Sequence, residues 1–161
     1  MDKLNFFGVG PKIGMIALPW LAVSIILSVF FDSKFVFFSN GNNIIFYIGL
    51  ALIIAGIVMY FISALTLLKG LKKTNLVTEG TYYFCCNPIY SAIILLIIPG
   101  ISFMLNSWLV LTTSIVAYII FKIFIKSEYA EMEKFFGNDY IKYKSETPEF
   151  FPFPLRKLLR F

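Results

Sequence analysis

The chain has 161 residues, of which 59% are hydrophobic, 19 are phenylalanines and only 14% are charged. A water-soluble domain of this length cannot hide so much apolar surface, so the composition excludes an ordinary soluble protein. Backbone amides cannot stay unpaired in lipid. The sequence therefore predicts an all-α, polytopic integral membrane bundle that forms a single domain over residues 1–161.

The missing residue types exclude several kinds of chemistry. Histidine is absent, which removes the usual general base near neutral pH and histidine-ligated metals. The two cysteines, Cys85 and Cys86, are adjacent, so they fit neither a disulfide framework nor a metal site. The net charge of +5 is not gathered into a basic stripe. We therefore expect membrane lipid, rather than nucleic acid or a metal, as a partner.

Four apolar stretches approach the roughly 17–25 residues that a membrane-spanning helix needs. They are predicted at about Gly14–Phe31, Ile44–Leu68, Tyr90–Leu105 and Ser107–Ile125. The first two spans belong to an N-terminal part, residues 1–75, and the last two belong to residues 76–161. Only Asn106 and Ser107 interrupt the last two spans, which predicts a tight antiparallel hairpin between them.

Lysines predict how these spans are oriented. They lie before the first span, after the second and at the end of the fourth: Lys3, Lys12, Lys69, Lys72, Lys73, Lys122 and Lys126. The loop of residues 32–43 carries one lysine and one aspartate. By the positive-inside tendency, both termini and the loop of residues 69–88 are predicted to be cytoplasmic.

The chain becomes polar after Lys126 and is predicted to leave the membrane there. Apolar residues recur at three- and four-residue steps in Tyr129, Met132 and Phe136. This spacing predicts a cytoplasmic amphipathic C-terminal helix that ends at Gly137, with Asn138 capping a short second helix through Tyr143. Three prolines predict an extended end: Pro148, Pro152 and Pro154.

The spans hold few polar residues, and none of them is Asp, Glu, Lys or Arg before Lys122. This absence argues against a small ion-coupled transporter, which needs such groups within the membrane. Small residues are expected to let helices pack closely at Gly49, Ala51, Ala55 and Gly56. Gly8 and Gly10 form a lone G-x-G with no preceding strand, which is not a nucleotide-binding signature.

Two polar segments, residues 76–92 and 128–153, remain as candidates for function. The first contains Leu-Val-Thr-Glu-Gly-Thr-Tyr from Leu76 to Tyr82, followed by Asn87-Pro88-Ile89-Tyr90. The second contains Glu128, Met132, Phe136-Gly137, Tyr140, Tyr143, Pro148 and Pro152. Taken alone, the residues of the first segment fit a functional site and a turn-rich, membrane-anchored loop equally well.

Together the two segments resemble the isoprenylcysteine carboxyl methyltransferase and phospholipid methyltransferase superfamily. The first block of that family is approximately L-V-T-x-G-P-Y-x-x-x-R-H-P-x-Y-x-G. Its second block is E-E-x-x-L-x-x-x-F-G-x-x-Y-x-x-Y with a proline-rich end. The order of the blocks and the helical hairpin between them also match. The resemblance covers residues 76–153 and does not extend to the first two spans.

The resemblance implies a membrane-embedded methyltransferase that binds S-adenosyl-L-methionine in a cytoplasm-facing pocket, beside a lipid-open groove. Its substrate would be lipophilic, either an isoprenylcysteine-like carboxylate or a phospholipid amine. Six residues are implied in cofactor binding: Tyr82, Asn87, Tyr90, Glu128, Tyr140 and Tyr143. No catalytic residue is assigned, because alignment and exclusion of water do most of the work in a methyl transfer. A catalytically silent relative that acts as a membrane scaffold or partner subunit is the alternative.

The chain departs from the family pattern at several motif positions. Cys86-Asn87 replace Arg-His, Tyr129 replaces the second Glu, Ala92 replaces a Gly, and Glu149 replaces an Arg. Asn87 is expected to donate a hydrogen bond from its amide, as a neutral imidazole would. Cys86 cannot replace a guanidinium, so a clamp for a carboxylate is either lost or supplied by a nearby lysine.

Overall fold

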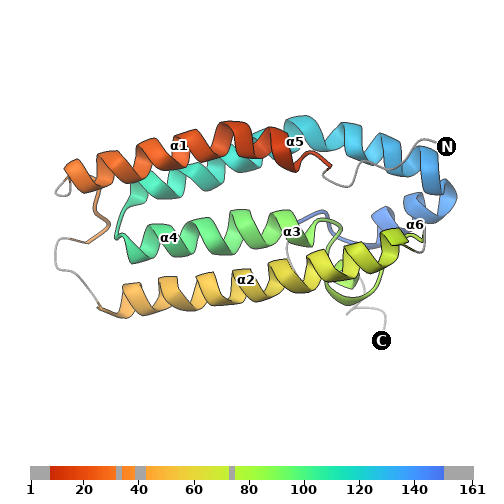
Figure 1. The fold of residues 1–161 in the computed structure, drawn as a ribbon, viewed down its shortest axis with the longest axis horizontal. Coiled ribbons are helices and arrows are strands. Elements are labelled where there is room, and N and C mark those ends of the chain that lie inside the picture. The colour runs from red at the N-terminus through yellow and green to blue at the C-terminus, as the bar shows by residue number, and fades with distance from the viewer. Residues whose placement is uncertain (1–7, 32–33, 39–42, 73–74, 151–161) are drawn as a thin grey trace.

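The structure is a computed structural model that describes residues 8–31, 34–38, 43–72 and 75–150 (Figure 1). Within these residues the chain is helical, and its extended pairing is one antiparallel bridge between Val36 and Ser107. In the part of the chain that the structure describes, three helices are long and apolar enough to cross a membrane: α1 (Gly10–Phe30), α2 (Asn43–Lys72) and α5 (Trp108–Phe136).

The third predicted span is a shorter apolar helix that runs from Pro88 to Met104, and we call it the third helix. It consists of α3 (Pro88–Ser91), a π-helical segment η3 (Ala92–Ile97) and α4 (Ile98–Met104). The wider turns precede Pro99, which has no amide hydrogen to continue the regular ladder. At 1.5 Å per residue this helix is about 25 Å long, whereas α2 and α5 each reach roughly 45 Å. Both long helices therefore extend beyond it.

The helices pack as two neighbouring pairs, α1 with α5 and α2 with the third helix, and α4 joins the pairs through α5 (Figure 1). The hydrophobic core lies between α1, the third helix and α5. Its buried members are Val9, Ile13, Ala17, Ile94, Ile98, Ala117, Ile120, Phe121 and Ile125.

Helix α2 meets the third helix through small residues spaced seven apart, Gly49, Gly56 and Ser63, which are buried. A Cβ atom on Gly49 would lie 2.6 Å from the carbonyl oxygen of Gly100, so the two backbones are in contact. The predicted packing role is confirmed for Gly49 and Gly56. It is wrong for Ala51 and Ala55, which are exposed, because steps of one or two residues turn a side chain by roughly 100° or 200° around the helix.

The outward face of α2 is apolar. Its exposed large side chains include Ile54, Ile57, Val58, Phe61 and Leu65. Only 11% of its most apolar window is buried inside the bundle. Lipid accepts such a surface, whereas water does not. The exterior of the bundle is therefore compatible with a membrane protein.

Two helices differ from the predicted boundaries. Helix α1 begins at Gly10 rather than Gly14, because Pro11 occupies its first turn, where a missing amide hydrogen costs nothing. Helix α5 passes through Lys126 without a break and ends at Phe136. The predicted fourth span and the predicted tail helix are thus one helix, since a change from apolar to polar side chains does not by itself interrupt backbone hydrogen bonds.

Gly137 ends α5 with a φ of +55°, as predicted, and α6 (Asn138–Glu146) follows it. The prediction that Asn138 caps this helix is wrong. Gly137 holds the cap position, and no side chain caps the first turn. The helix also passes Tyr143, and its buried residues are Tyr140 and Tyr143. The predicted extended residues Pro152 and Pro154 lie outside the described residues.

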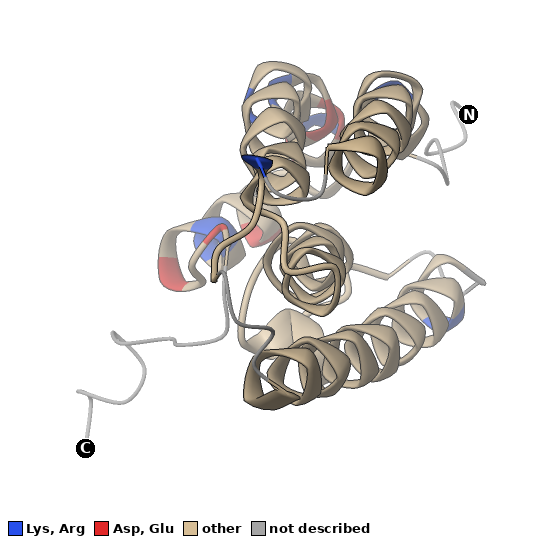
Figure 2. Cartoon of the chain, turned by 90° about the vertical axis from the view of Figure 1, so that its left-hand side faces the viewer, with Lys and Arg blue, Asp and Glu red and all other residues tan. Residues whose placement is uncertain are grey.

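The predicted hairpin at Asn106 and Ser107 is confirmed. Asn106 adopts a φ of +49°, and the Ser107 hydroxyl accepts a hydrogen bond from the amide of Val110 at 3.5 Å, which caps α5. This turn lies at the end of the bundle away from α6 (Figure 1). In the described part of the chain, every acidic residue belongs to the α6 end, and Figure 2 looks toward it from the hairpin end.

Candidate functional site

A cavity of about 450 Å³ lies where α2 and α5 extend beyond the third helix. Its walls come from the segment before α1, from α2, from the connection of residues 75–87, from the start of the third helix, and from α5 and α6. All six predicted site residues line it: Tyr82, Asn87, Tyr90, Glu128, Tyr140 and Tyr143. Asn87 and Glu128, which belong to separate motifs, therefore border the same space.

Glu128 forms part of the α5 wall. Its Oε2 accepts hydrogen bonds from the amide of Val9 at 3.0 Å and from the hydroxyl of Tyr90 at 3.3 Å. Val9 precedes α1, so the carboxylate lies at the positive end of that helix dipole. Among the described residues no donor reaches Oε1, and this oxygen is left for a ligand.

The segment before α1 completes this wall, although no motif marked it. Gly8 has a φ of +49°, and a Cβ atom there would collide with the carboxylate of Glu128 and lie 3.1 Å from the hydroxyl of Tyr90. Gly8 and Gly10 both line the cavity. The only signal in the sequence was two glycines ahead of Pro11, because the contact with Glu128 exists only in the folded chain.

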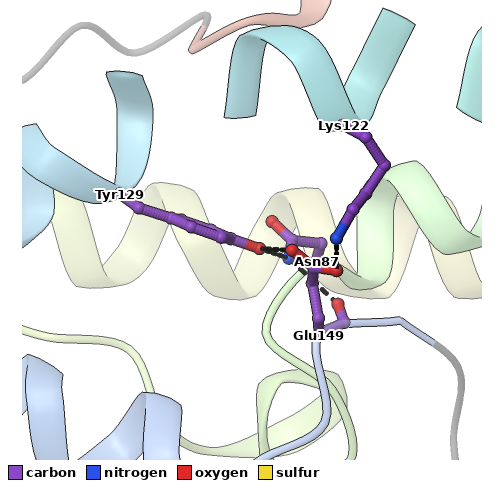
Figure 3. Close-up of polar contacts among 4 residues, drawn as sticks. All are labelled: Asn87, Lys122, Tyr129 and Glu149. Carbon is purple, nitrogen blue, oxygen red and sulfur yellow. Dashed lines mark hydrogen bonds and ion pairs between the residues drawn. The ribbon is translucent and has the colours of Figure 1, made fainter. Parts of the chain in front are cut away.

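Asn87 belongs to a second wall and is only 5% exposed. Its Nδ2 donates to the hydroxyl of Tyr129 at 2.6 Å and to the backbone carbonyl of Glu149 at 2.9 Å. The Tyr129 hydroxyl donates to Oε1 of Glu149 at 3.1 Å, and Lys122 Nζ lies 2.5 Å from Oε2 of Glu149 (Figure 3). We call these four residues the Asn87 network.

The Asn87 network sets the direction of the Asn87 amide. A backbone carbonyl only accepts hydrogen bonds, so the nitrogen of Asn87 must face Glu149. Asn87 does donate from its amide, as expected, and both amide hydrogens go to partners within the chain. Oδ1 has no partner in the described part of the chain, so Asn87 offers a ligand an acceptor. Three departures from the family pattern, Asn87, Tyr129 and Glu149, contact one another here.

Three tyrosines close the cavity near α6. The hydroxyl of Tyr143 donates to the backbone carbonyl of Tyr82 at 2.7 Å, which ties α6 to the short helix η2 (Gly80–Tyr83). Burial raises the pKa of Tyr82 and of Tyr140 above the usual range, and the nearby charge of Glu128 adds to both shifts. Both phenols are thus neutral near pH 7. Their hydroxyls have no hydrogen bond within the described residues and can donate to a ligand.

Cys86 lines the same cavity without a nucleophilic role. Its amide donates to the carbonyl of Pro148 at 2.8 Å, and its thiol donates to the carbonyl of Thr147 at 3.5 Å. Burial raises the pKa of the thiol to about 11. A thiol with this pKa is almost fully protonated near pH 7, so Cys86 holds the segment after α6 in place.

The lining combines acidic and aromatic groups. Glu128 and Glu131 contribute carboxylates, and the described lining contains no lysine or arginine. The tyrosines that border the cavity are Tyr60, Tyr82, Tyr90, Tyr129, Tyr140 and Tyr143. Apolar residues fill the remaining wall, among them Ala64, Leu67, Ile93 and Met132. Carboxylates and aromatic faces both attract cations, so the cavity suits a cationic molecule with apolar parts.

Comparison of the chain with protein-family models, with curated proteins and with solved structures found no match. The methyltransferase resemblance therefore stays a prediction that rests on the two motif blocks of residues 76–153.

Proposed function

We propose that the protein is a membrane-embedded, S-adenosylmethionine-dependent methyltransferase that acts on a lipophilic, membrane-partitioned substrate. One observation carries the proposal: the six residues implied by two separate motif blocks line a single cavity whose walls favour a cation. The cofactor is a sulfonium cation, so the lining matches its charge. A volume of about 450 Å³ also falls within the roughly 300–1,000 Å³ of small-molecule sites.

The polar atoms that lack a partner among the described residues are the groups suited to hold the cofactor. Oε1 of Glu128 suits its ribose hydroxyls or its cationic end. The hydroxyls of Tyr82 and Tyr140 suit its acceptor atoms, and Oδ1 of Asn87 suits a donor. The ring of Tyr90 supplies an aromatic face to positive charge.

When bound, S-adenosylmethionine supplies a methyl group on a positively charged sulfur. The residues of the chain would orient the cofactor and the substrate and exclude water, rather than act as acids or bases. The apolar side chains of α2 and the third helix exclude water from the reacting atoms, which favours dispersal of the positive charge. The walls on α5 and α6 would orient the cofactor toward the substrate.

We further propose a multi-pass arrangement in which the third helix crosses the membrane together with α1, α2 and α5, and the cavity faces the cytoplasm. Support comes from lysines at the cavity end, including Lys12, Lys69 and Lys126, whereas Lys34 is the lysine of the described residues at the hairpin end. In this arrangement the part of α5 beyond Lys126 is the cytoplasmic amphipathic helix, and α6 follows it on the same side. The N- and C-termini would both be cytoplasmic.

Binding of the product analogue S-adenosylhomocysteine tests the proposal. Purified protein in detergent is expected to bind it, as measured by calorimetry. Glu128→Ala is expected to weaken binding at least tenfold, or about 1.4 kcal/mol, because Oε1 is lost. Glu79→Ala is the matched control, since Glu79 is exposed at the same end and does not line the cavity.

Two outcomes would contradict the proposal. One is no binding to folded, monodisperse wild-type protein, which would favour the catalytically silent scaffold. The other is an equal loss of affinity in Glu79→Ala, which would place the ligand elsewhere. Glu128→Gln separates charge from structure, because its amide oxygen can still accept from Val9 and Tyr90.

A further inference from the structure

The cavity lining discriminates between the two methyl acceptors that the motifs leave open. A carboxylate acceptor is an anion, and burying it requires a cation or several N–H donors. The described lining has neither lysine nor arginine and carries the carboxylates of Glu128 and Glu131. An anion in this cavity would face like charges, whereas a protonatable amine would face opposite charges.

Two lysines near the cavity might have replaced the lost guanidinium, but each is paired with a carboxylate. Lys144, which lies over the ring of Tyr129, pairs with Glu133 at 2.9 Å, and neither residue lines the cavity. Lys122 is the cation of the Asn87 network, and its Nζ lies 2.5 Å from Oε2 of Glu149. Lys122 is not among the residues that line the cavity. Its charge is balanced by Glu149 outside the cavity, so it provides no clamp for a carboxylate.

Asn87 gives an independent indication of the same preference. The residue is 5% exposed, and both hydrogens of its amide are bound by Tyr129 and Glu149. Oδ1 has no donor within the described residues. Because Asn87 lines the cavity, a ligand that brings an N–H group can pair with this acceptor. A carboxylate brings only acceptors and cannot do so.

We propose that the methyl acceptor is an amine on a membrane-partitioned molecule rather than a carboxylate, an inference that rests on the proposed function. The lone pair of the neutral amine forms the new bond from nitrogen to the methyl carbon. The bond from that carbon to sulfur breaks, and its electron pair stays on sulfur, which becomes an uncharged thioether. Nitrogen takes the positive charge. Where nitrogen carries hydrogen, its proton then leaves to water or to the exposed carboxylate of Glu131.

This balance explains why an acidic lining suits an amine acceptor. The positive charge moves from sulfur to nitrogen within the cavity and is not lost. Glu128 and Glu131 therefore stabilise a cation before and after the transfer. With a carboxylate acceptor the same side chains would repel the substrate before the reaction and would have no cation left to stabilise after it.

Two probes with the same alkyl chain, dodecylamine and dodecanoate, test the inference. Each is added to detergent-purified protein with and without S-adenosylhomocysteine, and binding is measured by calorimetry. In parallel, transfer of labelled methyl from S-adenosylmethionine to each probe is followed. Dodecylamine is expected to bind at least tenfold more tightly and to be methylated. Equal or tighter binding of dodecanoate, or formation of its methyl ester, would overturn the inference.

A charge reversal in the lining sharpens the test. Glu131→Lys is expected to weaken dodecylamine binding at least tenfold and to strengthen dodecanoate binding. Glu79→Lys makes the same charge change outside the cavity and is expected to leave the ratio of the two affinities unchanged. If wild-type protein binds S-adenosylhomocysteine but prefers dodecanoate, only the inference is wrong. If it does not bind S-adenosylhomocysteine, both the proposed function and the inference are wrong.

Discussion

At the hairpin end of the bundle several polar side chains bind one another, although Oδ1 of Asn106 is buried without a partner in the described part of the chain, whereas at the cavity end several polar side chains without such a partner border the cavity. The hydroxyls of Ser28 and Ser107 lie 2.6 Å apart, and Ser102 donates to the carbonyl of Ser107 at 2.7 Å. Asn106 Nδ2 donates to the carbonyl of Phe38 at 2.8 Å. These contacts join α1, α4, α5 and the loop that follows α1, so their role is structural.

At the cavity end the corresponding atoms remain available. They are Oε1 of Glu128, Oδ1 of Asn87 and the hydroxyls of Tyr82 and Tyr140, none of which is bonded within the described residues. All four residues line the cavity, so these atoms can meet a ligand there. The comparison therefore separates polar residues that hold the fold together from polar residues that are available to a ligand.

The largest expected effect is a loss of stability when α2 is forced away from the third helix. Gly49→Leu is expected to lower the free energy of unfolding by about 3 kcal/mol or to prevent folding, because a side chain there meets the backbone of Gly100. Ala51→Leu is the matched control on the exposed face of α2 and is expected to be nearly neutral. Thermal denaturation in detergent measures both. Similar effects of the two variants would contradict the backbone contact.

An intermediate effect is expected in the reactivity of Cys86. Burial raises the pKa of its thiol from 9.0 to about 11, so near pH 7.4 the folded protein holds roughly 100-fold less thiolate than the unfolded chain. Alkylation by iodoacetamide should be slower by that factor and should rise about tenfold per pH unit until pH 11. Mass spectrometry of wild type and Cys86→Ser assigns the site. Equal rates in folded and denatured protein would mean that the cavity is wetter than the structure implies.

The smallest expected effect is a modest loss of stability from a substitution at the hairpin end, with no change in ligand affinity at the cavity end. Ser107→Ala removes the cap of α5 and the contact with Ser28, and is expected to lower the free energy of unfolding by about 1–2 kcal/mol. Ser127→Ala, at an exposed serine on the same helix, should cost less than about 0.5 kcal/mol. Affinity for S-adenosylhomocysteine should not change in either variant. A changed affinity in Ser107→Ala would show that the two ends are coupled.

Much of the fold follows from local patterns. The apolar runs predicted the three long helices to within a few residues of their ends, apart from the C-terminal end of α5. Gly137 and Asn106 marked turns correctly because a positive φ is a property of one residue and its neighbours. The continuation of α5 past Lys126 was missed, since polarity shows where a helix meets water and not where its hydrogen bonds stop.

By itself, the sequence determined that the chain is helical, that its outer surface is apolar, and which two segments carry the polar residues of the site. Composition and periodicity are properties of neighbouring residues, so they can be seen without a fold. Only the tertiary structure decided which atoms face the cavity. The direction of the Asn87 amide depends on Tyr129 and Glu149, and the free oxygen of Glu128 depends on Val9, and these partners are far away in the chain. The chemistry that the cavity offers follows from those long-range hydrogen bonds.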